Sequence, residues 1–244
     1  MNKIETKSLT DRTFWSQYWS TFQPAIVTDV LFSDLFDEFP GPNSTFIEIG
    51  GFPGTFSVYF KQFRSYDVTL LDNFLFPSIV RKLESVNSLP EGSISLIECD
   101  FLKFNTTIRY DIVFSAGFVE HFDDTNYVLQ KHFELLKPGG TLFVSVPNFR
   151  GLNGLIQRVF DRAYYDAHNL DAMNTKTLHG ICRSLDFARY EIFYYGKPCL
   201  WLEKSAKVSW PIRSMVQRLS EKISTIKGNN QFFSPFIVIR GQRN

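Results

Sequence analysis

Beyond residue 44, short apolar runs alternate with amphipathic stretches along the chain. The runs have the length of buried strands, and the stretches between them repeat apolar residues at helical spacing. Strands and helices that alternate in this way build a mostly parallel α/β sheet with helices on both faces. The predicted strands are Thr45–Ile49, Asp67–Leu71, Ile94–Glu98, Tyr110–Phe114 and Thr141–Val146, and the predicted helices between them are Thr55–Arg64, Pro77–Ser88 and Thr125–Leu136.

The first 42 residues predict a helical cap rather than a part of the sheet. Aromatic residues recur at helical spacing over residues 14–22, and either Thr10 or Asp11 is placed to cap that helix. A second helix is expected over residues 24–35, before a break rich in proline and glycine. The main domain is therefore expected to span residues 43–244.

The second half of that domain is less regular. After the fifth strand comes a long connection, residues 149–175, and then the predicted helix Thr175–Leu185 and strand Arg189–Tyr195. A basic amphipathic stretch, residues 203–228, separates this strand from the last predicted strand, Phe232–Arg240.

Composition and charge narrow the class of protein. The 26 basic residues are balanced by 25 acidic residues, so the chain lacks the basic footprint of a nucleic-acid-binding protein and no such partner is expected. Three cysteines are too few for a disulfide framework or a zinc site, and no metal site is expected. The first 12 residues are polar, and no apolar run has the length of a membrane span, which predicts a cytoplasmic protein.

Two features of the composition leave alternatives open. Residues 203–244 hold eight basic and two acidic residues. The stretch 203–228 therefore either lies on an anionic membrane surface, contacts a second copy of the chain, or packs on the domain with a solvated basic face. Similarly, the 26 phenylalanines either line a pocket or fill the core.

Glycines and acidic residues follow the first three predicted strands. Gly50, Gly51 and Gly54 allow the backbone to approach a ligand closely. Their register departs from the G-x-G-x-x-G pattern, which counts against a nicotinamide-dependent oxidoreductase. Asp72 is placed to accept hydrogen bonds from both hydroxyls of a ribose, and Asp100 from an adenine amino group. Each of these residues, taken alone, is also an ordinary turn residue.

Taken in order, the segments resemble the motifs of class I S-adenosylmethionine-dependent methyltransferases of the type that acts on small molecules or glycans. The resemblance covers roughly residues 45–148. It implies a Rossmann-like sheet of seven strands whose last strand is antiparallel and lies beside the fifth, with S-adenosyl-L-methionine as the cofactor. The matching segments are Glu48–Gly54, Asp72, Glu98–Asp100, Phe114–Phe122 and Leu136–Leu142.

The resemblance also implies which residues hold the parts of the cofactor. Glu48 would order its ammonium group, and the glycines would admit its methionine part. The family usually has glycine where Phe52 stands, which leaves open a non-catalytic relative that serves as a partner subunit. The remaining implied contacts are Asp72 and Asn73 to the ribose, Asp100 and Phe101 to the adenine, and Ser115 and Gly117 beside the sulfur.

Two histidines are candidates for the base. Methyl transfer from a sulfonium requires alignment and, for an acceptor that carries a proton, a group to receive it. His121 lies in the loop after the fourth strand, and an unperturbed imidazole titrates near pH ~6.5. It either takes this proton, or it orients the loop or stacks near the adenosine. His168 is the second candidate, in the acceptor-side insertion 149–175.

The acceptor is expected to be a small molecule or the sugar of a glycan, methylated on oxygen or nitrogen. Ser115–Phe118 lacks the Asn-Pro-Pro-aromatic sequence that methyltransferases acting on adenine or glutamine have at this place. Asn148 is either a contact to the acceptor or a plain turn former. The aromatic candidates for acceptor contacts are Trp15, Tyr18, Trp19 and Tyr164, although core packing is an equal alternative for the two tryptophans.

Overall fold

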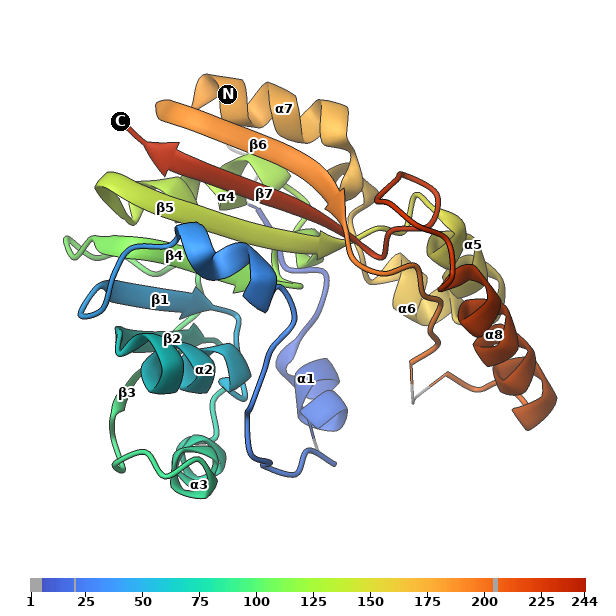
Figure 1. Ribbon diagram of the computed structural model, residues 1–244, viewed down its shortest axis with the longest axis horizontal. Coiled ribbons are helices and arrows are strands. Elements are labelled where there is room, and N and C mark those ends of the chain that lie inside the picture. Colours follow the sequence, from blue (N-terminus) through green and yellow to red (C-terminus); the bar gives the residue numbers. More distant parts are fainter. Residues whose placement is uncertain (1–5, 20, 204–205) are drawn as a thin grey trace.

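The computed structural model describes residues 6–19, 21–203 and 206–244 (Figure 1). Within these residues, seven strands form one sheet in the order β3-β2-β1-β4-β5-β7-β6. Neighbours pair in parallel from β3 to β5, and β7 runs antiparallel to both β5 and β6. The expected Rossmann-like sheet is therefore confirmed. The strands are β1 (Thr45–Ile49), β2 (Asp67–Asp72), β3 (Ile94–Glu98), β4 (Tyr110–Ala116), β5 (Leu136–Pro147), β6 (Phe187–Tyr195) and β7 (Phe236–Arg243).

Helices cover both faces of the sheet, because successive residues of a strand point to opposite sides. In β1, Phe46 faces one layer, and Ile47 and Ile49 face the other. The first layer contains two helices and a 3-10 helix, α2 (Thr55–Arg64), α3 (Pro77–Val86) and η1 (Ser33–Glu38), and the second contains α4 (Thr125–Glu134) and α7 (Thr175–Ser184).

Many of the phenylalanines gather in the layer around η1 and α2. The rings of Phe46 and Phe60 lie 4.4 Å apart, and Phe114 stacks on Phe143 at 5.2 Å. Ring pairs at these distances add to the free energy gained by burying their apolar area. Phenylalanine thus fills the core on this face, and other phenylalanines line the cavity described below.

The first helix of the cap forms as expected. This helix, α1 (Arg12–Trp19), is preceded by Asp11, whose Oδ1 accepts a hydrogen bond from the backbone N of Phe14 at 2.8 Å. An aspartate in this position satisfies a backbone donor that the first helical turn leaves free. Residues 1–5 and 20 of the predicted cap, and residues 204–205 of the predicted basic stretch, lie outside the described residues.

The second predicted helix of the cap, over residues 24–35, is wrong. Residues 22–30 contain no helix, and only the 3-10 helix η1 follows. The buried side chain of Asn87 holds this segment: its Oδ1 accepts from Val27 N at 2.6 Å, and its Nδ2 donates to Ala25 O at 3.1 Å. These tertiary hydrogen bonds replace the intrahelical bonds that the apolar pattern predicted.

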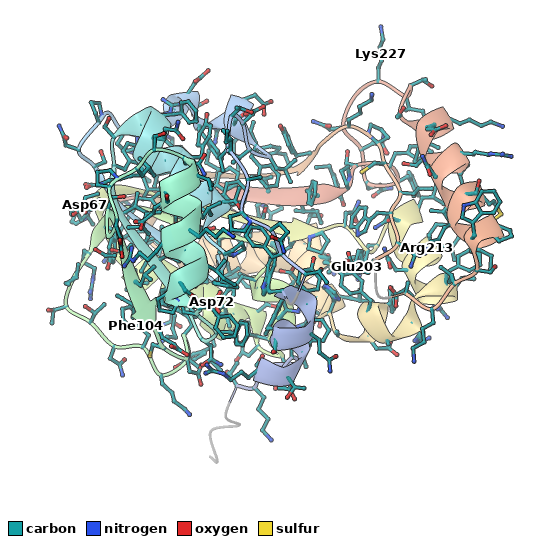
Figure 2. The ribbon with its side chains drawn as sticks, turned by 90° about the horizontal axis from the view of Figure 1, so that it is seen from below. Asp67, Asp72, Phe104, Glu203, Arg213 and Lys227 are labelled. Atoms are coloured by element: carbon teal, nitrogen blue, oxygen red, sulfur yellow. The ribbon has the colours of Figure 1, made fainter. Side chains whose placement is uncertain are left out.

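Three helices, α5 (Leu152–Phe160), α6 (Arg162–Asp166) and α8 (Trp210–Ile223), lie together to one side of the sheet (Figure 1). α8 packs Val216 and Ile223 into a small core with Ile156 of α5. Arg213 Nη2 donates to Glu203 O at 2.9 Å, which ties α8 to the chain before it (Figure 2). Part of the apolar side of the basic stretch thus packs on the domain, whereas Trp210, Met215 and Leu219 are exposed. No helix in the described part of the chain is long and apolar enough to cross a membrane.

Candidate functional site

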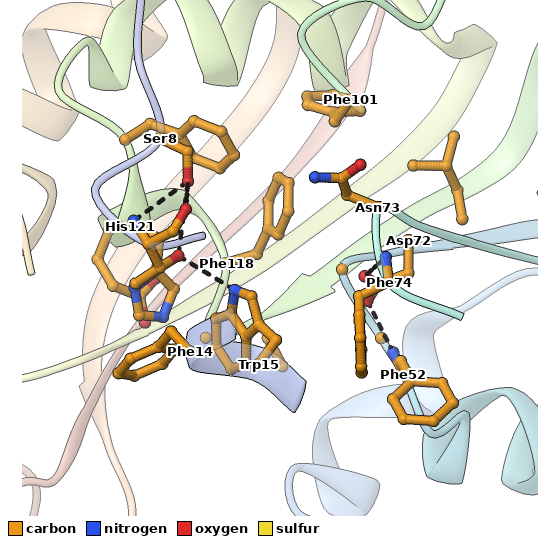
Figure 3. A pocket seen from close by; sticks show the side chains of 18 of the residues that line it. Ser8, Phe14, Trp15, Phe52, Asp72, Asn73, Phe74, Phe101, Phe118 and His121 are labelled. Atoms are coloured by element: carbon orange, nitrogen blue, oxygen red, sulfur yellow. Dashed lines mark hydrogen bonds between the residues drawn. The ribbon is translucent and has the colours of Figure 1, made fainter. Parts of the chain in front are cut away.

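A cavity of about 1460 Å³ lies at the carboxyl ends of strands β1 to β5 (Figure 3). Ligands of open α/β sheets bind at this edge, because the loops after the strands converge there. The segment before α1 and α1 itself form the opposite wall. The predicted site residues that line the cavity are Glu48, Gly50, Gly51, Asp72, Asn73, Asp100, Phe101, Gly117, His121, His168, Trp15, Tyr18, Trp19 and Tyr164.

Asp72 joins two of the loops at the end of the sheet. Its Oδ2 accepts from Phe52 N at 3.0 Å and its Oδ1 accepts from Phe74 N at 2.8 Å (Figure 3). Burial raises the pKa of Asp72 to about 6, against the lowering effect of these backbone donors. Each carboxylate oxygen has two lone pairs, so Asp72 holds the glycine turn and still has acceptor capacity for a ligand.

The glycine turn requires the absence of side chains. A Cβ on Gly50, whose φ is +67°, would lie 2.0 Å from the Phe118 ring, and a Cβ on Gly51 would lie 2.1 Å from the Glu48 side chain. The turn therefore fits between these two side chains only as glycine. Gly54 lies further on, at the start of α2, where a Cβ would meet the Leu70 side chain at 3.1 Å.

Glu48 is buried beneath this turn. Its Oε2 accepts from both the backbone N, at 2.8 Å, and the Oγ of Ser57 in α2. Burial raises the pKa of Glu48 to about 8, although the two hydrogen bonds from Ser57 work against the rise. A positive charge that enters the cavity beside Glu48 would favour its ionised form.

The loop after β3 lines the cavity beside the loops that follow β1 and β2. Asp100 Oδ1 accepts from Leu102 N at 3.0 Å, and both Asp100 and Phe101 line the cavity. Phe101 lies edge-to-face with Phe118 at 5.5 Å, and the Lys131 ammonium lies 5.6 Å from its ring centre. Phe101 is therefore held as a flat apolar surface at the cavity wall.

Phe52, at the position where the family usually has glycine, packs against aromatic side chains of other segments. Its ring packs edge-to-face against Trp19 of α1 at 5.9 Å and against Phe74 at 5.9 Å. The side chain is 3% exposed and joins the glycine turn to the cap. Phe52 thus forms part of an aromatic wall shared by three segments.

The far end of the cavity contains both predicted histidines. His121 Nδ1 bonds Ala167 O at 3.2 Å, His168 Nδ1 bonds Tyr164 O at 2.6 Å, and the two ring centroids lie 4.7 Å apart. Burial lowers the pKa of His121 to about 3, with His168 adding to the effect, and lowers the pKa of His168 to about 4. Both imidazoles are therefore neutral at pH 7.

Glu120 is the functional candidate that the sequence predictions left out. Its side chain lines the cavity and is 1% exposed, and its Oε2 is buried without a hydrogen-bond partner among the described residues. Burial raises the pKa of Glu120 to about 8. Its position directly before His121, in a loop after a strand, is the sequence signal that could have identified it.

The cap closes this end of the cavity. Leu9 N donates to His121 O at 2.7 Å, and Lys7 N donates to Asp123 Oδ1 at 2.8 Å. These bonds place α1 so that Trp15 lies edge-to-face with His121 at 5.1 Å. The aromatic candidates Trp15, Tyr18, Trp19 and Tyr164 therefore all face the cavity.

Two phenols at this end lie near the same carboxyl group. Burial raises the pKa of Tyr18 to about 12, with the Glu203 carboxyl adding to the rise. The same two causes raise the pKa of Tyr164. Both phenols therefore stay protonated at neutral pH and are hydrogen-bond donors rather than bases.

Three of the predicted contacts, Gly54, Ser115 and Asn148, are absent from the residues that line the cavity. Gly54 precedes α2, and the other two have structural positions. Ser115 is fully buried in β4, and its Oγ bonds His132 Nε2 at 3.1 Å in the core. Asn148 donates through Nδ2 to Gln231 O and to Ser234 O, each at 2.9 Å, and so fixes the segment before β7. Strand alternation explains the position of Ser115, since Ala116 rather than Ser115 faces the cavity.

The sequence matches a family model described as a methyltransferase domain over residues 23–192. No curated protein matches the sequence at a significant level. Among solved structures, a SAM-dependent methyltransferase from Archaeoglobus fulgidus is similar, with 19% identity and a TM-score of 0.56, over 87% of this chain and 91% of that chain.

Two further structures are similar at lower identity. Phosphoethanolamine N-methyltransferase 2 of Haemonchus contortus, in complex with S-adenosyl-L-methionine, has 16% identity and a TM-score of 0.59, over 84% of this chain and 50% of that chain. The N-methyltransferase NodS of Bradyrhizobium japonicum, in complex with S-adenosyl-L-homocysteine, has 14% identity and a TM-score of 0.52, over 96% and 99%.

At these identities the solved structures show that the fold is shared. The family model, which covers more than half of the chain, shows the family. The glycine turn and the acidic residues at the strand ends, on which the expected family depended, line the cavity. The strand order is the one that the resemblance implied. The chain belongs to the methyltransferase-domain family, as a class I S-adenosylmethionine-dependent methyltransferase.

Proposed function

We propose that this chain transfers the methyl group of S-adenosyl-L-methionine to a small molecule or to the sugar of a glycan. The observation that carries the proposal is a single cavity that combines the strand-end loops with the aromatic side chains of α1 and α6. Its volume of about 1460 Å³ exceeds the ~300–1,000 Å³ of a typical site for one ligand. The cavity therefore has room for the cofactor and an acceptor side by side.

The cofactor is proposed to bind along the ends of β1, β2 and β3. Asp72, with Asn73, would accept hydrogen bonds from the ribose hydroxyls, while the adenine lies against Phe101 with its amino group near Asp100. The methionine part would follow the glycine turn, where the backbone is free of side chains. Its ammonium group would then lie near the buried carboxyl of Glu48, which favours a positive charge when ionised.

The reaction is a displacement at the methyl carbon. A lone pair of the acceptor oxygen or nitrogen forms the new bond, the carbon–sulfur bond breaks, and its electron pair stays on the sulfur of S-adenosylhomocysteine. Because the sulfonium is already an activated leaving group, the chain contributes mainly alignment and exclusion of water. We propose His121 or His168 as the group that receives the acceptor proton through Nε2, since the Nδ1 of each is bonded to a backbone carbonyl.

We call the part of the cavity lined by His121 and His168 the acceptor end, and the part at the ends of β1, β2 and β3 the cofactor end. Small acceptors are favoured because the cap covers the acceptor end. The bonds from residues 7–9 to the loop 121–123 hold α1 across the opening. A similar structure, that of the Haemonchus contortus enzyme, is named for a small phosphorylated amine. Both observations support an acceptor that enters the cavity whole rather than a site on a large macromolecule.

Calorimetric titration with S-adenosylhomocysteine tests the cofactor part of the proposal. We expect Asp72→Asn to weaken binding by about 10- to 100-fold, the loss typical of hydrogen bonds donated to a charged group. The matched control is Asp67→Asn, because Asp67 begins the same strand at its exposed end (Figure 2). Binding that is absent in the unmodified chain at millimolar ligand, or equal in the two variants, would contradict the proposal.

Turnover is tested separately, with isotopically labelled S-adenosylmethionine and fractionated small-molecule extracts. We expect label to pass to a small-molecule or sugar fraction and S-adenosylhomocysteine to accumulate. Tight cofactor binding without transfer in any fraction would support the alternative that the chain is a non-catalytic partner subunit.

A further inference from the structure

Glu120, His121 and His168 form a compact cluster at the acceptor end of the cavity. One potential ligand atom of each residue lies within 4.8 Å of those of the other two. We infer that this cluster binds a divalent first-row transition-metal ion, of which Zn²⁺ is the representative case. The ion would stand beside the acceptor, and its part in methyl transfer rests on the function proposed above.

The two histidines are oriented as metal ligands usually are. Each Nδ1 bonds a backbone carbonyl, His121 that of Ala167 and His168 that of Tyr164. A carbonyl oxygen only accepts, so each Nδ1 carries the hydrogen and each Nε2 keeps its lone pair. Metal-binding histidines almost always donate their second ring nitrogen in this way, which fixes both the tautomer and the ring orientation.

Glu120 supplies an independent observation. Its side chain is 1% exposed, and its Oε2 is buried with no hydrogen-bond partner among the described residues. A buried carboxyl oxygen without a partner is costly and needs a physical explanation. A cation held between Glu120 and the two imidazole nitrogens would provide one.

The two loops that carry these residues are joined by hydrogen bonds. Asn169 N donates to Glu120 O at 2.7 Å, and Asn169 Nδ2 donates to Phe122 O at 2.9 Å and to Asp123 O at 3.1 Å. His168 is therefore held in register with Glu120 and His121, although it lies far away in the sequence. Support of this kind from neighbouring polar groups is what positions the ligands of a metal site.

The ligand set indicates the class of ion. Two imidazoles and one carboxylate suit Zn²⁺, Fe²⁺, Mn²⁺ and Co²⁺ rather than Ca²⁺ or Mg²⁺, which prefer oxygen ligands. In a tetrahedral site, ligand bonds of roughly 2.1 Å place two ligand atoms about 3.4 Å apart. A separation of up to 4.8 Å thus requires a contraction of up to roughly 1.4 Å on binding.

Three protein ligands leave positions on the ion open toward the cavity, since all three residues line it. With both Nε2 lone pairs on the ion, water replaces the histidines as the group that receives the acceptor proton. An acceptor hydroxyl bound to the ion loses that proton more readily, because a bound cation lowers the pKa of the coordinated oxygen. The resulting oxygen can attack the methyl carbon while the carbon–sulfur bond breaks. This chemistry favours an acceptor with a hydroxyl, alone or beside a second chelating oxygen.

Metal binding is measured on the full chain after treatment with a chelator. Titration with Co²⁺, followed by its visible absorption, and with Zn²⁺, followed by calorimetry, should show one ion per chain. Glu120→Gln and His168→Asn should each weaken Zn²⁺ binding by at least about 100-fold. His179→Asn is the control, since His179 in α7 is absent from the residues that line the cavity and should leave the affinity unchanged.

S-adenosylhomocysteine binding is titrated on the same samples, so that the two proposals can fail separately. Stoichiometric metal binding without binding of the nucleoside would leave the metal site standing and remove the proposed function. Binding of the nucleoside by a chain that takes up no Zn²⁺ or Co²⁺, or that loses none of its metal affinity in the two cavity variants, would overturn the metal site. Thermal unfolding of each variant shows whether it is folded, and His168→Asn tests the site independently should Glu120→Gln fail to fold.

Discussion

The two ends of the cavity are built from the chain in different ways. The cofactor end comes from loops that directly follow β1, β2 and β3, all between residues 48 and 103. The acceptor end joins the cap, the loop after β4, the α6 region and Trp201, which are widely separated in the sequence. The order of the strands alone brings the residues of the cofactor end together. The acceptor end forms only when several distant segments pack together.

The polar groups of the two ends also differ in their hydrogen-bond partners. At the proposed cofactor end, the Asp72 and Asp100 carboxylates accept hydrogen bonds from backbone N–H groups of their own loops, and Asp72 also accepts one from Phe52 of the glycine turn. At the proposed acceptor end, His121 bonds a carbonyl of another loop and His168 bonds that of Tyr164, while Glu120 Oε2 has no partner among the described residues. The two aspartates thus have hydrogen-bond donors in the chain itself, whereas the other end holds a buried carboxyl oxygen that the described residues leave without one.

The largest effect is expected from a change at the glycine turn. In Gly50→Ala the new Cβ would stand 2.0 Å from the Phe118 ring at a φ of +67°, so the turn or the ring must move. We expect the affinity for S-adenosylhomocysteine to fall by about 100-fold in a calorimetric titration. Gly92→Ala is the control, since Gly92 has a φ of +80° with no atom within 4 Å. An equal loss in both variants would mean that backbone strain rather than close approach is responsible.

A change at the acceptor end should affect the acceptor and spare the cofactor. Trp15→Ala removes the ring that lies against His121. Once an acceptor is known, its KM should rise by roughly 10-fold or more, the loss expected for a buried aromatic contact. The dissociation constant of S-adenosylhomocysteine should stay within about threefold, because the strand-end loops are untouched.

Trp210→Ala is the matched tryptophan control, because Trp210 is 76% exposed on α8. It should change neither constant. A Trp15→Ala variant that loses cofactor affinity as strongly as acceptor affinity would show that the two ends act as one unit.

This contrast also explains how much could be predicted from the sequence. The glycines and Asp72 directly follow apolar runs, so the parallel sheet brings them together whatever the rest of the chain does. β1, α2 and β3 have the predicted bounds. Ser115 was misplaced by one residue, a shift that moves a strand side chain to the opposite face of the sheet.

The parts that the sequence did not reveal depend on distant partners. The extended segment around Val27 requires the Asn87 side chain, which lies in another element. Asn148 was expected either to contact the acceptor or to form a turn, and its amide nitrogen donates to carbonyls of the segment before β7. Glu120 next to His168 likewise results from the docking of two loops, which no local pattern reports.

A smaller effect is expected of pH on the affinity for S-adenosylhomocysteine at the cofactor end. Burial raises the pKa of Asp72 to about 6, with Glu98 adding to the rise, and Asp72 in turn raises that of Glu48. Because the ionised carboxylate is the form that accepts from the ribose, affinity for S-adenosylhomocysteine should fall as pH drops below 6, by up to about tenfold per pH unit.

The effect on folding has the opposite sign. A carboxyl whose pKa is raised on folding favours the folded state most at low pH, and this contribution is lost as pH rises through about 6. Asp72→Asn should flatten both the binding and the unfolding profile in this range. An unchanged profile in that variant would assign the titration to Glu48 instead.

The smallest expected effect tests the interior beneath the cofactor end. Ser57→Ala removes the Oγ that donates to Glu48 and helps to lower its pKa, so more of Glu48 is protonated at pH 7. Affinity for S-adenosylhomocysteine should fall about threefold at pH 7 and recover near pH ~9, when the carboxyl ionises and again favours the ammonium. Ser93→Ala, which breaks a similar serine–glutamate bond to Glu84 in the α3 region, should leave the affinity unchanged. A loss in Ser57→Ala that persists at high pH would mean that Ser57 acts through the shape of the turn, and that the charge of Glu48 has no part in holding the cofactor.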